Sequence, residues 1–298
     1  MPLNSYKILF VINPFSGNQN KPDWEDEIRN YFLNSEHTIY FFHLSSQQNE
    51  NSIKEEIFKI KPQRVIAVGG DGTVTTVAKS VMGTDIAMGI LPAGSANGMA
   101  RELEIPMDEH EAMELIIKGE IKKTDMVKVN DEMSLHLSDV GMNAELIKYF
   151  SEGNRRGKWG YARVLLKVLV KRSYLQVFVE TEKMIVQRKA LVVIIANASK
   201  YGFGAVINPD GNLHDGLFEV VVVRRLAVSE LFKMWFRPQP FNRKKIEIYK
   251  AKSVKIEMKH KAHFQVDGEY LGKVDHVSAR ILPGILQLIL PSVTEPVK

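Results

Sequence analysis

Three glycines surround one carboxylate in the segment Gly69-Gly70-Asp71-Gly72-Thr73, directly after the apolar run at 65–68. A strand that breaks into glycines and re-enters a helix presents bare backbone N–H groups at the helix N-terminus, and such an arrangement binds phosphate. The glycines permit close approach of the backbone and positive φ angles, while the Asp71 carboxylate can orient a Mg²⁺ ion or a hydroxyl group. The alternative is an ordinary strand-to-helix turn, because Gly-Asp-Gly suits turns.

Two more loops of this kind follow apolar runs in the first half of the chain. The run at 7–12 ends in Asn13-Pro14-Phe15-Ser16-Gly17, and the run at 86–91 ends in Pro92-Ala93-Gly94-Ser95-Ala96-Asn97-Gly98. Loops at the carboxyl ends of parallel strands meet at one edge of the sheet and form its ligand crevice. Each loop alone has an ordinary turn composition, but the three together favour a phosphate cradle.

These loops need a scaffold of alternating strands and helices, and the sequence predicts one over about the first 125 residues. Apolar runs at 7–12, 38–44, 65–68 and 86–91 are typical of strands, and helical periodicity appears at 24–33, 53–60, after 73 and at 109–118. Strands then follow with few helices between them, at 127–129, 134–137, 175–179, 191–196, 217–223, 254–258 and 263–266. We therefore expect a parallel wound sheet at 1–126 and a largely antiparallel domain at 127–298. The final apolar segment, within about 281–298, can pair with either domain.

Composition limits the class of protein. The 298 residues are 45% hydrophobic and 25% charged, which fits a soluble globular chain with a substantial core. Cysteine is absent, which excludes disulfides, a thiolate nucleophile and Cys-ligated metals. No stretch reaches the ~18 uncharged apolar residues of a membrane span, and the N-terminus lacks a signal-peptide pattern. The net charge of +5 favours anionic partners, but no nucleic-acid-binding module is present, so we expect no nucleic acid among them.

The three loops, in this order, resemble the catalytic domain of the diacylglycerol kinase and sphingosine kinase family of lipid kinases. The resemblance covers about residues 7–290, because later segments of the family are similar to 197–204, Pro209-Asp210-Gly211, His214-Asp215-Gly216-Leu217 and Asp267-Gly268-Glu269. NAD kinases and phosphofructokinases share an element similar to Gly-Gly-Asp-Gly-Thr. The specificity of the resemblance therefore comes from combining that element with the first loop and with Asp-Gly-Glu.

The resemblance implies an ATP-dependent phosphorylation of a lipid hydroxyl. It also implies a Rossmann-like nucleotide domain, of the NAD kinase and phosphofructokinase type, followed by a β-sandwich-like domain. Carried over by position, the implied ATP contacts are Asn13, Pro14, Phe15, Ser16, Gly17, Gly69, Gly70, Asp71, Gly72, Thr73, Ser95 and Asn97, with Ser45 as a looser match.

The same resemblance implies that Glu269 accepts the proton of the lipid hydroxyl, with Asp267 beside it and Asp71 as a further catalytic carboxylate. Phosphoryl transfer depends mostly on positioning and charge neutralisation, and a carboxylate in hydrogen-bond reach of the attacking hydroxyl can take its proton. The alternative is a hairpin turn, since Asp-Gly is a favoured hairpin pair. The two interpretations are compatible.

Bacterial members of the family hold a metal on the loop that matches residues 212–217 of this chain. The resemblance therefore implies a metal bound by Asn212, Asp215 and the backbone carbonyl of Leu217. Oxygen-only ligands suit a hard ion such as Mg²⁺, and the alternative is a capped turn at a strand entry. The third loop departs from the family pattern. Many bacterial diacylglycerol kinases carry Gly-Thr-Ala-Asn-Asp there, whereas this chain has Gly94-Ser95-Ala96-Asn97-Gly98, which is more similar to sphingosine and ceramide kinases. The acceptor is therefore left open among diacylglycerol, phosphatidylglycerol and a sphingoid-type lipid.

A lipid substrate requires contact with a membrane. The expected helix at 160–172 places Arg163, Lys167 and Lys171 on one stripe, and a basic amphipathic helix can lie on an anionic bilayer. The alternative is a solvated face of a core-packed helix. A second candidate is the apolar segment 231–237, followed by basic residues at 243–245.

The sequence thus predicts a cytoplasmic, peripherally membrane-associated lipid kinase that uses ATP and Mg²⁺, with a homodimer left open. Two other hypotheses are an NAD kinase-like small-molecule kinase and a non-catalytic protein that binds lipid or nucleotide. The first loop and the Asp-Gly-Glu segment count against an NAD kinase. Loss of ATP turnover on Glu269→Ala would count against the non-catalytic hypothesis.

Overall fold

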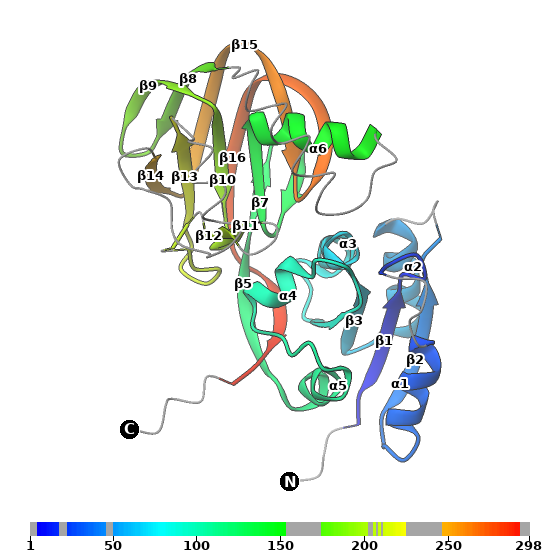
Figure 1. The fold of residues 1–298 in the computed structure, drawn as a ribbon. Coiled ribbons are helices and arrows are strands. Elements are labelled where there is room, and N and C mark those ends of the chain that lie inside the picture. The colour runs from blue at the N-terminus through cyan, green and yellow to red at the C-terminus, as the bar shows by residue number, and fades with distance from the viewer. Residues whose placement is uncertain are drawn as a thin grey trace. The chain divides into compact units, whose positions relative to one another are not determined.

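The computed structural model describes residues 5–17, 23–45, 50–152, 174–201, 205–206, 208–209, 211–224 and 246–292. The predicted basic helix at 160–172 and the apolar segment 231–237 lie outside these residues, as do Asp210 and part of the 197–204 motif. The chain divides into two compact units, Met1–Thr124 with Gly284–Lys298, and Asp125–Pro283. Figure 1 shows the helices and strands of both units. Each unit has its own hydrophobic core. Within the described residues, no helix has the length and apolar character needed to cross a membrane.

A parallel sheet forms the centre of the first unit, in the order β4-β3-β1-β2. Its strands are β1 (Lys7–Ile12), β2 (Thr38–His43), β3 (Arg64–Gly69) and β4 (Ala87–Pro92), and every neighbouring pair runs parallel. The last part of β16 (Glu269–Leu290) extends this sheet, because Gln287 pairs in parallel with Ala87. The predicted wound parallel sheet is confirmed.

The helices of this unit follow the strands as the sequence predicts. They are α1 (Trp24–Phe32), α2 (Glu50–Ile60), α3 (Asp71–Val81), the short α4 (Gly98–Glu102) and α5 (Glu109–Lys118). Aspartates cap two of them: Asp23 accepts the N–H of Glu25 at the start of α1, and Asp108 accepts that of Glu111 at the start of α5. Both helices bury apolar side chains against Phe10 and Ile66 of the sheet. The sheet is therefore a fixed platform for the loops at its edge.

The second unit is an antiparallel, sandwich-like assembly of strands, as expected. The strand β5 (Glu120–Val129) leads into it. It is followed by β6 (Glu132–Ser134), β7 (Leu137–Gly141), α6 (Met142–Glu152), β8 (Leu175–Thr181), β9 (Ile185–Ala190), β10 (Val192–Ala196), β11 (Lys200–Tyr201), β12 (Ala205–Val206), β13 (Phe218–Val223), β14 (Ile246–Ala251), β15 (Ser253–Val266) and β16.

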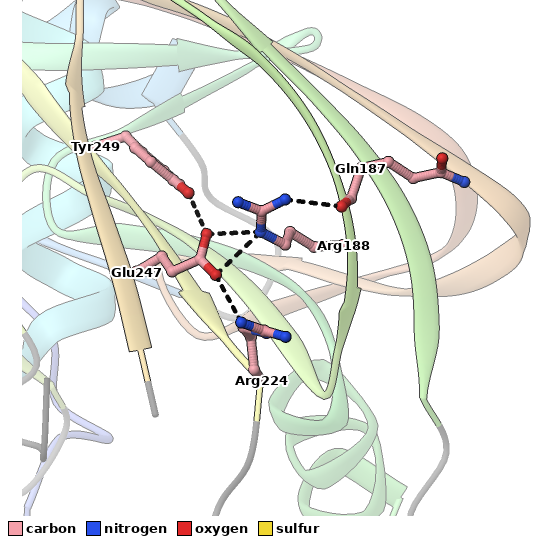
Figure 2. A network of polar contacts seen from close by, with 5 residues as sticks. All are labelled: Gln187, Arg188, Arg224, Glu247 and Tyr249. Carbon is pink, nitrogen blue, oxygen red and sulfur yellow. Dashed lines mark hydrogen bonds and ion pairs between the residues drawn. The ribbon is translucent and has the colours of Figure 1, made fainter. Parts of the chain in front are cut away.

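The long strand β15 joins the two halves of this assembly. Its first part pairs with β8, which pairs with β9, and its last part pairs with β7, which continues through β10 and β13 to β14. Within the described residues, β9 and β14 each have one strand neighbour. Side chains link these two edges: Glu247 of β14 accepts hydrogen bonds from Arg188 of β9 at 2.7 and 3.0 Å, and from Arg224 at 3.1 Å (Figure 2). Among the described residues, side-chain ion pairs therefore connect β9 and β14, which do not pair through their backbones.

Two predicted strands differ from the structure for identifiable reasons. The run at 134–137 is not one strand, because β6 ends at Ser134 and β7 begins at Leu137. The backbone N–H groups in this interval donate to a side chain, Asp267, instead of to a ladder. The runs at 254–258 and 263–266 are parts of the single strand β15, whose pairing with β16 shifts between Glu257 and Ala262.

Candidate functional site

The first loop is tied to the second through Asn13. Its backbone N–H donates to Val68 O at 3.0 Å, so the loop leaves β1 beside the end of β3. The Asn13 side-chain amide donates to Thr73 Oγ1 at 3.0 Å, and its carbonyl oxygen accepts the N–H of Phe15 at 3.0 Å. One side chain therefore shapes its own turn and holds it against the first turn of α3.

Gly69 of the second loop and Gly94 of the third loop are needed for close packing. A Cβ on Gly69 would lie 2.3 Å from Thr73 Oγ1, and a Cβ on Gly94 of the third loop would lie 2.4 Å from the Cα of Gly70. At Gly72, a Cβ would meet nothing within 4 Å. Of the two properties that glycine permits here, the loop uses close approach and not positive φ, because Gly69, Gly70 and Gly72 all lie outside the left-handed region and the chain passes directly from strand to helix.

The Asp71 carboxylate joins the second loop to the third. Its two oxygens accept the backbone N–H groups of Gly98 at 3.0 Å and Met99 at 2.8 Å, at the start of α4. Asn97 lies in the left-handed region, with φ of 50°, and its side-chain oxygen accepts the N–H of Gly94 at 2.8 Å. Asp71 is thus a cap for α4, and any bond from it to Mg²⁺ or a hydroxyl would have to use the lone pairs that remain.

A pocket of about 230 Å³ lies beside the N-terminus of α3, lined by Asn13, Phe15, Leu44, Ser45, Gly72, Thr73 and Thr76. The loosely matched Ser45 is among these residues. The implied ATP contacts Pro14, Ser16, Gly17, Gly69, Gly70, Asp71, Ser95 and Asn97 do not line it. The pocket is smaller than the roughly 300–1,000 Å³ of common ligand sites, so it has room for a phosphate group or part of a nucleotide.

Leu44 and Thr76 also line the pocket, and neither was predicted from the sequence. Thr76 lies one turn after Thr73 in α3, and side chains three apart share a helix face. This spacing was a usable signal. Leu44 had none, because its place depends on β2 lying next to β1.

In the second unit, Asp267-Gly268 forms the predicted hairpin. Val266 pairs with Glu269, and the two central residues have φ of 47° and 88°, which is the pattern of a two-residue turn with positive φ at both positions. The Asp267 carboxylate accepts the Ser134 hydroxyl at 2.8 Å and the backbone N–H groups of Leu135, His136 and Leu137 at 2.8–3.1 Å. Asp267 thus anchors the connection between β6 and β7.

Glu269 differs from Asp267 in its surroundings. Its side chain is exposed, and within the described part of the chain it makes no hydrogen bond or ion pair. The next residue, Tyr270, has its hydroxyl 2.7 Å from His263 Nδ1 on the paired strand β15. Glu269 is therefore the carboxylate of this turn that is available to a substrate.

The loop at 212–217 is built from capped turns. Asn212 accepts the N–H of His214, and Asp215 accepts that of Leu217, each at 3.0 Å. Lys250 Nζ already lies 3.6 Å from Asp215 Oδ2 and 3.5 Å from the buried Glu219. Burial raises the pKa of the Glu219 carboxyl, while Asn208 and Lys250 oppose this rise.

The polar groups of this loop are partly engaged already. A lysine ammonium lies beside the Asp215 carboxylate that would bind the ion, and the side-chain oxygens of Asn212 and Asp215 each accept a backbone N–H. The capped turn is therefore present, the metal role of Asn212, Asp215 and Leu217 stays a prediction, and no step is routed through a metal here.

Two domain families match the chain. Residues 7–129 match the diacylglycerol kinase catalytic domain, and residues 139–290 match the YegS C-terminal NAD kinase beta sandwich-like domain. The chain belongs to this family of lipid kinases. Its members are phosphotransferases with an alcohol group as acceptor, and the two-domain fold predicted from the resemblance is confirmed.

Curated relatives agree with this assignment. The chain is 27% identical to a diacylglycerol kinase of Staphylococcus saprophyticus and 26% identical to one of Bacillus subtilis, over 70% of this chain and 71% of each relative. Its fold is similar to that of a diacylglycerol kinase from Bacillus anthracis, with a TM-score of 0.74 at 20% identity, covering 98% of this chain and 100% of that chain. A second structure from the same organism gives a TM-score of 0.77 at 22% identity, covering 96% and 98%.

Proposed function

We propose that this lipid kinase transfers the γ-phosphoryl group of ATP to a hydroxyl of a membrane lipid, with the ATP phosphates bound in the first unit beside α3. The observation that supports this most strongly is the joining of three separate loops by Asn13, Asp71 and the contact of Gly70 with Gly94. Three loops fixed to one another around a helix N-terminus form a rigid set of donors for phosphate. Thr73 and Ser45 add hydroxyl groups at the pocket.

In this proposal Asp71 acts by position. Its carboxylate fixes the third loop through the N–H groups of Gly98 and Met99, so that Ser95 and Asn97 are held near the nucleotide. When bound with ATP, Mg²⁺ neutralises the charge that develops on the transferring phosphoryl group. Asp71 would provide one charged ligand on the protein side through its remaining lone pairs.

Glu269 is the proton acceptor in the proposed reaction. The lipid hydroxyl oxygen forms a bond to Pγ, the bond from Pγ to the bridging oxygen of ADP breaks, and the hydroxyl proton passes to the Glu269 carboxylate. The exposed, unpaired state of this side chain among the described residues supports the role. Asp267 is a structural neighbour, since its oxygens already accept four hydrogen bonds.

The acceptor is proposed to be diacylglycerol, phosphatidylglycerol or a sphingoid-type lipid, reached from the cytoplasmic membrane surface, with the protein bound peripherally. The Gly94-Ser95-Ala96-Asn97-Gly98 loop lacks the acidic residue common in bacterial diacylglycerol kinases. The panel of acceptors must therefore include sphingoid lipids as well as diacylglycerol.

The test is a radiolabelled-ATP assay with Mg²⁺ on mixed vesicles that contain diacylglycerol, phosphatidylglycerol, a sphingoid base or ceramide, with NAD in a separate reaction. We expect one lipid product, and Glu269→Gln should lower kcat by about 10²–10⁴-fold. Glu257→Gln, at an exposed carboxylate on the paired strand β15, should leave kcat unchanged. Phosphorylation of NAD without any lipid product would replace the lipid proposal with an NAD kinase, and no product at all would overturn it.

A further inference from the structure

Gln265 is a polar side chain with no exposed surface, and it lies on β15 three residues before Gly268. Its Oε1 accepts the N–H of Gly268 at 2.8 Å, and its Nε2 donates to Asp139 Oδ2. The chemistry of the partners fixes which way the amide points, because an N–H requires the oxygen and a carboxylate requires the NH₂ group. Both ends of a buried side chain are thus committed to single partners.

Asp139 anchors the other end of this contact. It is 1% exposed and faces Gln265 across the β7–β15 ladder. Its Oδ1 accepts the N–H of Ala144 at 2.9 Å, and its Oδ2 accepts the Asn143 side-chain amide at 2.6 Å, both at the start of α6. The hydrogen bonds therefore run without interruption from the N-terminus of α6, through Asp139 and Gln265, to the turn before Glu269.

The hydrogen bond from the Gly268 N–H to the Gln265 side chain lies outside the strand ladder. In a two-residue hairpin the ladder uses the flanking residues, here Val266 and Glu269, and the N–H groups of the two central residues are left over. Gln265 holds the N–H of Gly268 from inside, and Asp267 holds the turn to the β6–β7 connection. Glu269 directly follows Gly268, so fixing the Gly268 peptide also restricts the backbone of Glu269.

We propose that Gln265 is a positioning residue for Glu269: it fixes the Gly268 peptide, and so sets where the exposed carboxylate stands when it takes the proton of the acceptor hydroxyl. The inference rests on the proposed role of Glu269. The Glu269 side chain has no partner of its own among the described residues, so its placement depends on the backbone that carries it. A displacement of about 1 Å at a reacting group can cost about 10²-fold in rate.

The first test is Gln265→Met, which keeps the length and apolar stem and removes both polar atoms. We expect kcat for the lipid to fall by at least about 30-fold, with the KM for ATP within about twofold, because the nucleotide contacts are untouched. The control is Ser138→Ala. Ser138 is fully buried beside Asp139, it pairs with Val266, and its hydroxyl has no partner among the described residues. Its kcat should stay within about twofold of wild type.

A second test separates hydrogen bonding from packing. Gln265→Glu places a carboxylate against Asp139 and should be at least as inactive as Gln265→Met. Adding Asp139→Asn restores a donor opposite an acceptor. The introduced NH₂ group can donate to the new carboxylate and, once the Asn143 amide has rotated by 180°, to Asn143 Oδ1, while the introduced oxygen still accepts the N–H of Ala144. The double variant should recover kcat to within about fivefold of wild type, as coupled neighbours do in a double-mutant cycle. A double variant no better than Gln265→Glu, at equal melting temperature, would overturn the proposal.

Amide exchange distinguishes this inference from the proposed function. In the wild type the Gly268 N–H should be protected, and in Gln265→Met it should exchange at least about tenfold faster. Wild-type lipid phosphorylation with unchanged kcat in Gln265→Met, or unchanged Gly268 exchange, overturns the positioning role and leaves the kinase proposal intact. No lipid product from the wild type overturns the kinase proposal, and the catalytic part of this inference with it.

Discussion

The loop at 69–73 and the turn at 267–269 both place an aspartate beside a glycine, and both aspartates accept backbone N–H groups of another loop. The glycines serve opposite needs. Gly70 approaches the backbone of Gly94 closely at an ordinary φ, whereas Gly268 has open space around it and a φ of 88°. The same residue types thus satisfy a packing constraint in one unit and a conformational constraint in the other.

The largest effect on stability is expected from a substitution at Asp267. Asp267→Ala leaves three N–H groups and a hydroxyl without their acceptor, and we expect a loss of about 3 kcal/mol in the free energy of unfolding, measured in urea. Asp131→Ala, at an exposed aspartate of the β5–β6 turn, should change that free energy by less than about 0.5 kcal/mol. Equal effects of the two changes would show that the Asp267 contacts contribute nothing net.

A substitution at Gly94 tests the packing constraint between the second and third loops. A Cβ placed 2.4 Å from the Cα of Gly70 forces the second and third loops apart, and overpacking of this kind costs about 1–3 kcal/mol. Gly94→Ala should therefore lower the melting temperature and raise the KM for ATP together. A variant with wild-type values of both would mean that the loops can separate without consequence for the nucleotide.

A substitution at Gly268 tests the conformational constraint, which is the positive φ angle of the hairpin turn. Because φ is strongly positive there and a Cβ would meet nothing within 4 Å, Gly268→Ala should cost about 1–2 kcal/mol through backbone strain alone. Gly268→Asn should cost less, since Asn tolerates positive φ better than Ala. Thermal unfolding of both variants gives the comparison, and an Asn variant less stable than the Ala variant would contradict it.

The smallest effect on stability is expected at Gly72, which has neither constraint. Gly72→Ala should raise the free energy of unfolding by about 0.5–1 kcal/mol, because Ala is the better helix former within α3. The same methyl group would stand in the pocket beside Thr73, so ATP affinity should fall while stability rises. Calorimetric titration with ATP checks this, and unchanged affinity would place the phosphates elsewhere.

The sequence predicted the structural features that depend on residues close together along the chain. Strand, glycine loop and helix followed from local pattern at 65–81, and Asp267-Gly268 predicted its own hairpin. It could not predict partners far along the chain. Asp71 caps α4 from 27 residues away, and Asp267 binds a connection about 130 residues before it. The helix α6 was missed for a different reason: its cap is local, since Asp139 accepts the N–H of Ala144, but Asp139 lies inside the strand β7 and not in a turn before the helix.

The strand β16 has a consequence for the order in which the protein is made. The sheet of the first unit is completed by residues near Gln287 and Leu288, which pair with β4. During synthesis, most of the first unit leaves the ribosome long before this strand, and nascent domains begin to fold as they emerge. The outer edge of β4 therefore waits, unpaired and apolar, until the second unit has been translated. A premature stop after residue 283 would leave the second unit fully translated but this edge of the first unit permanently open.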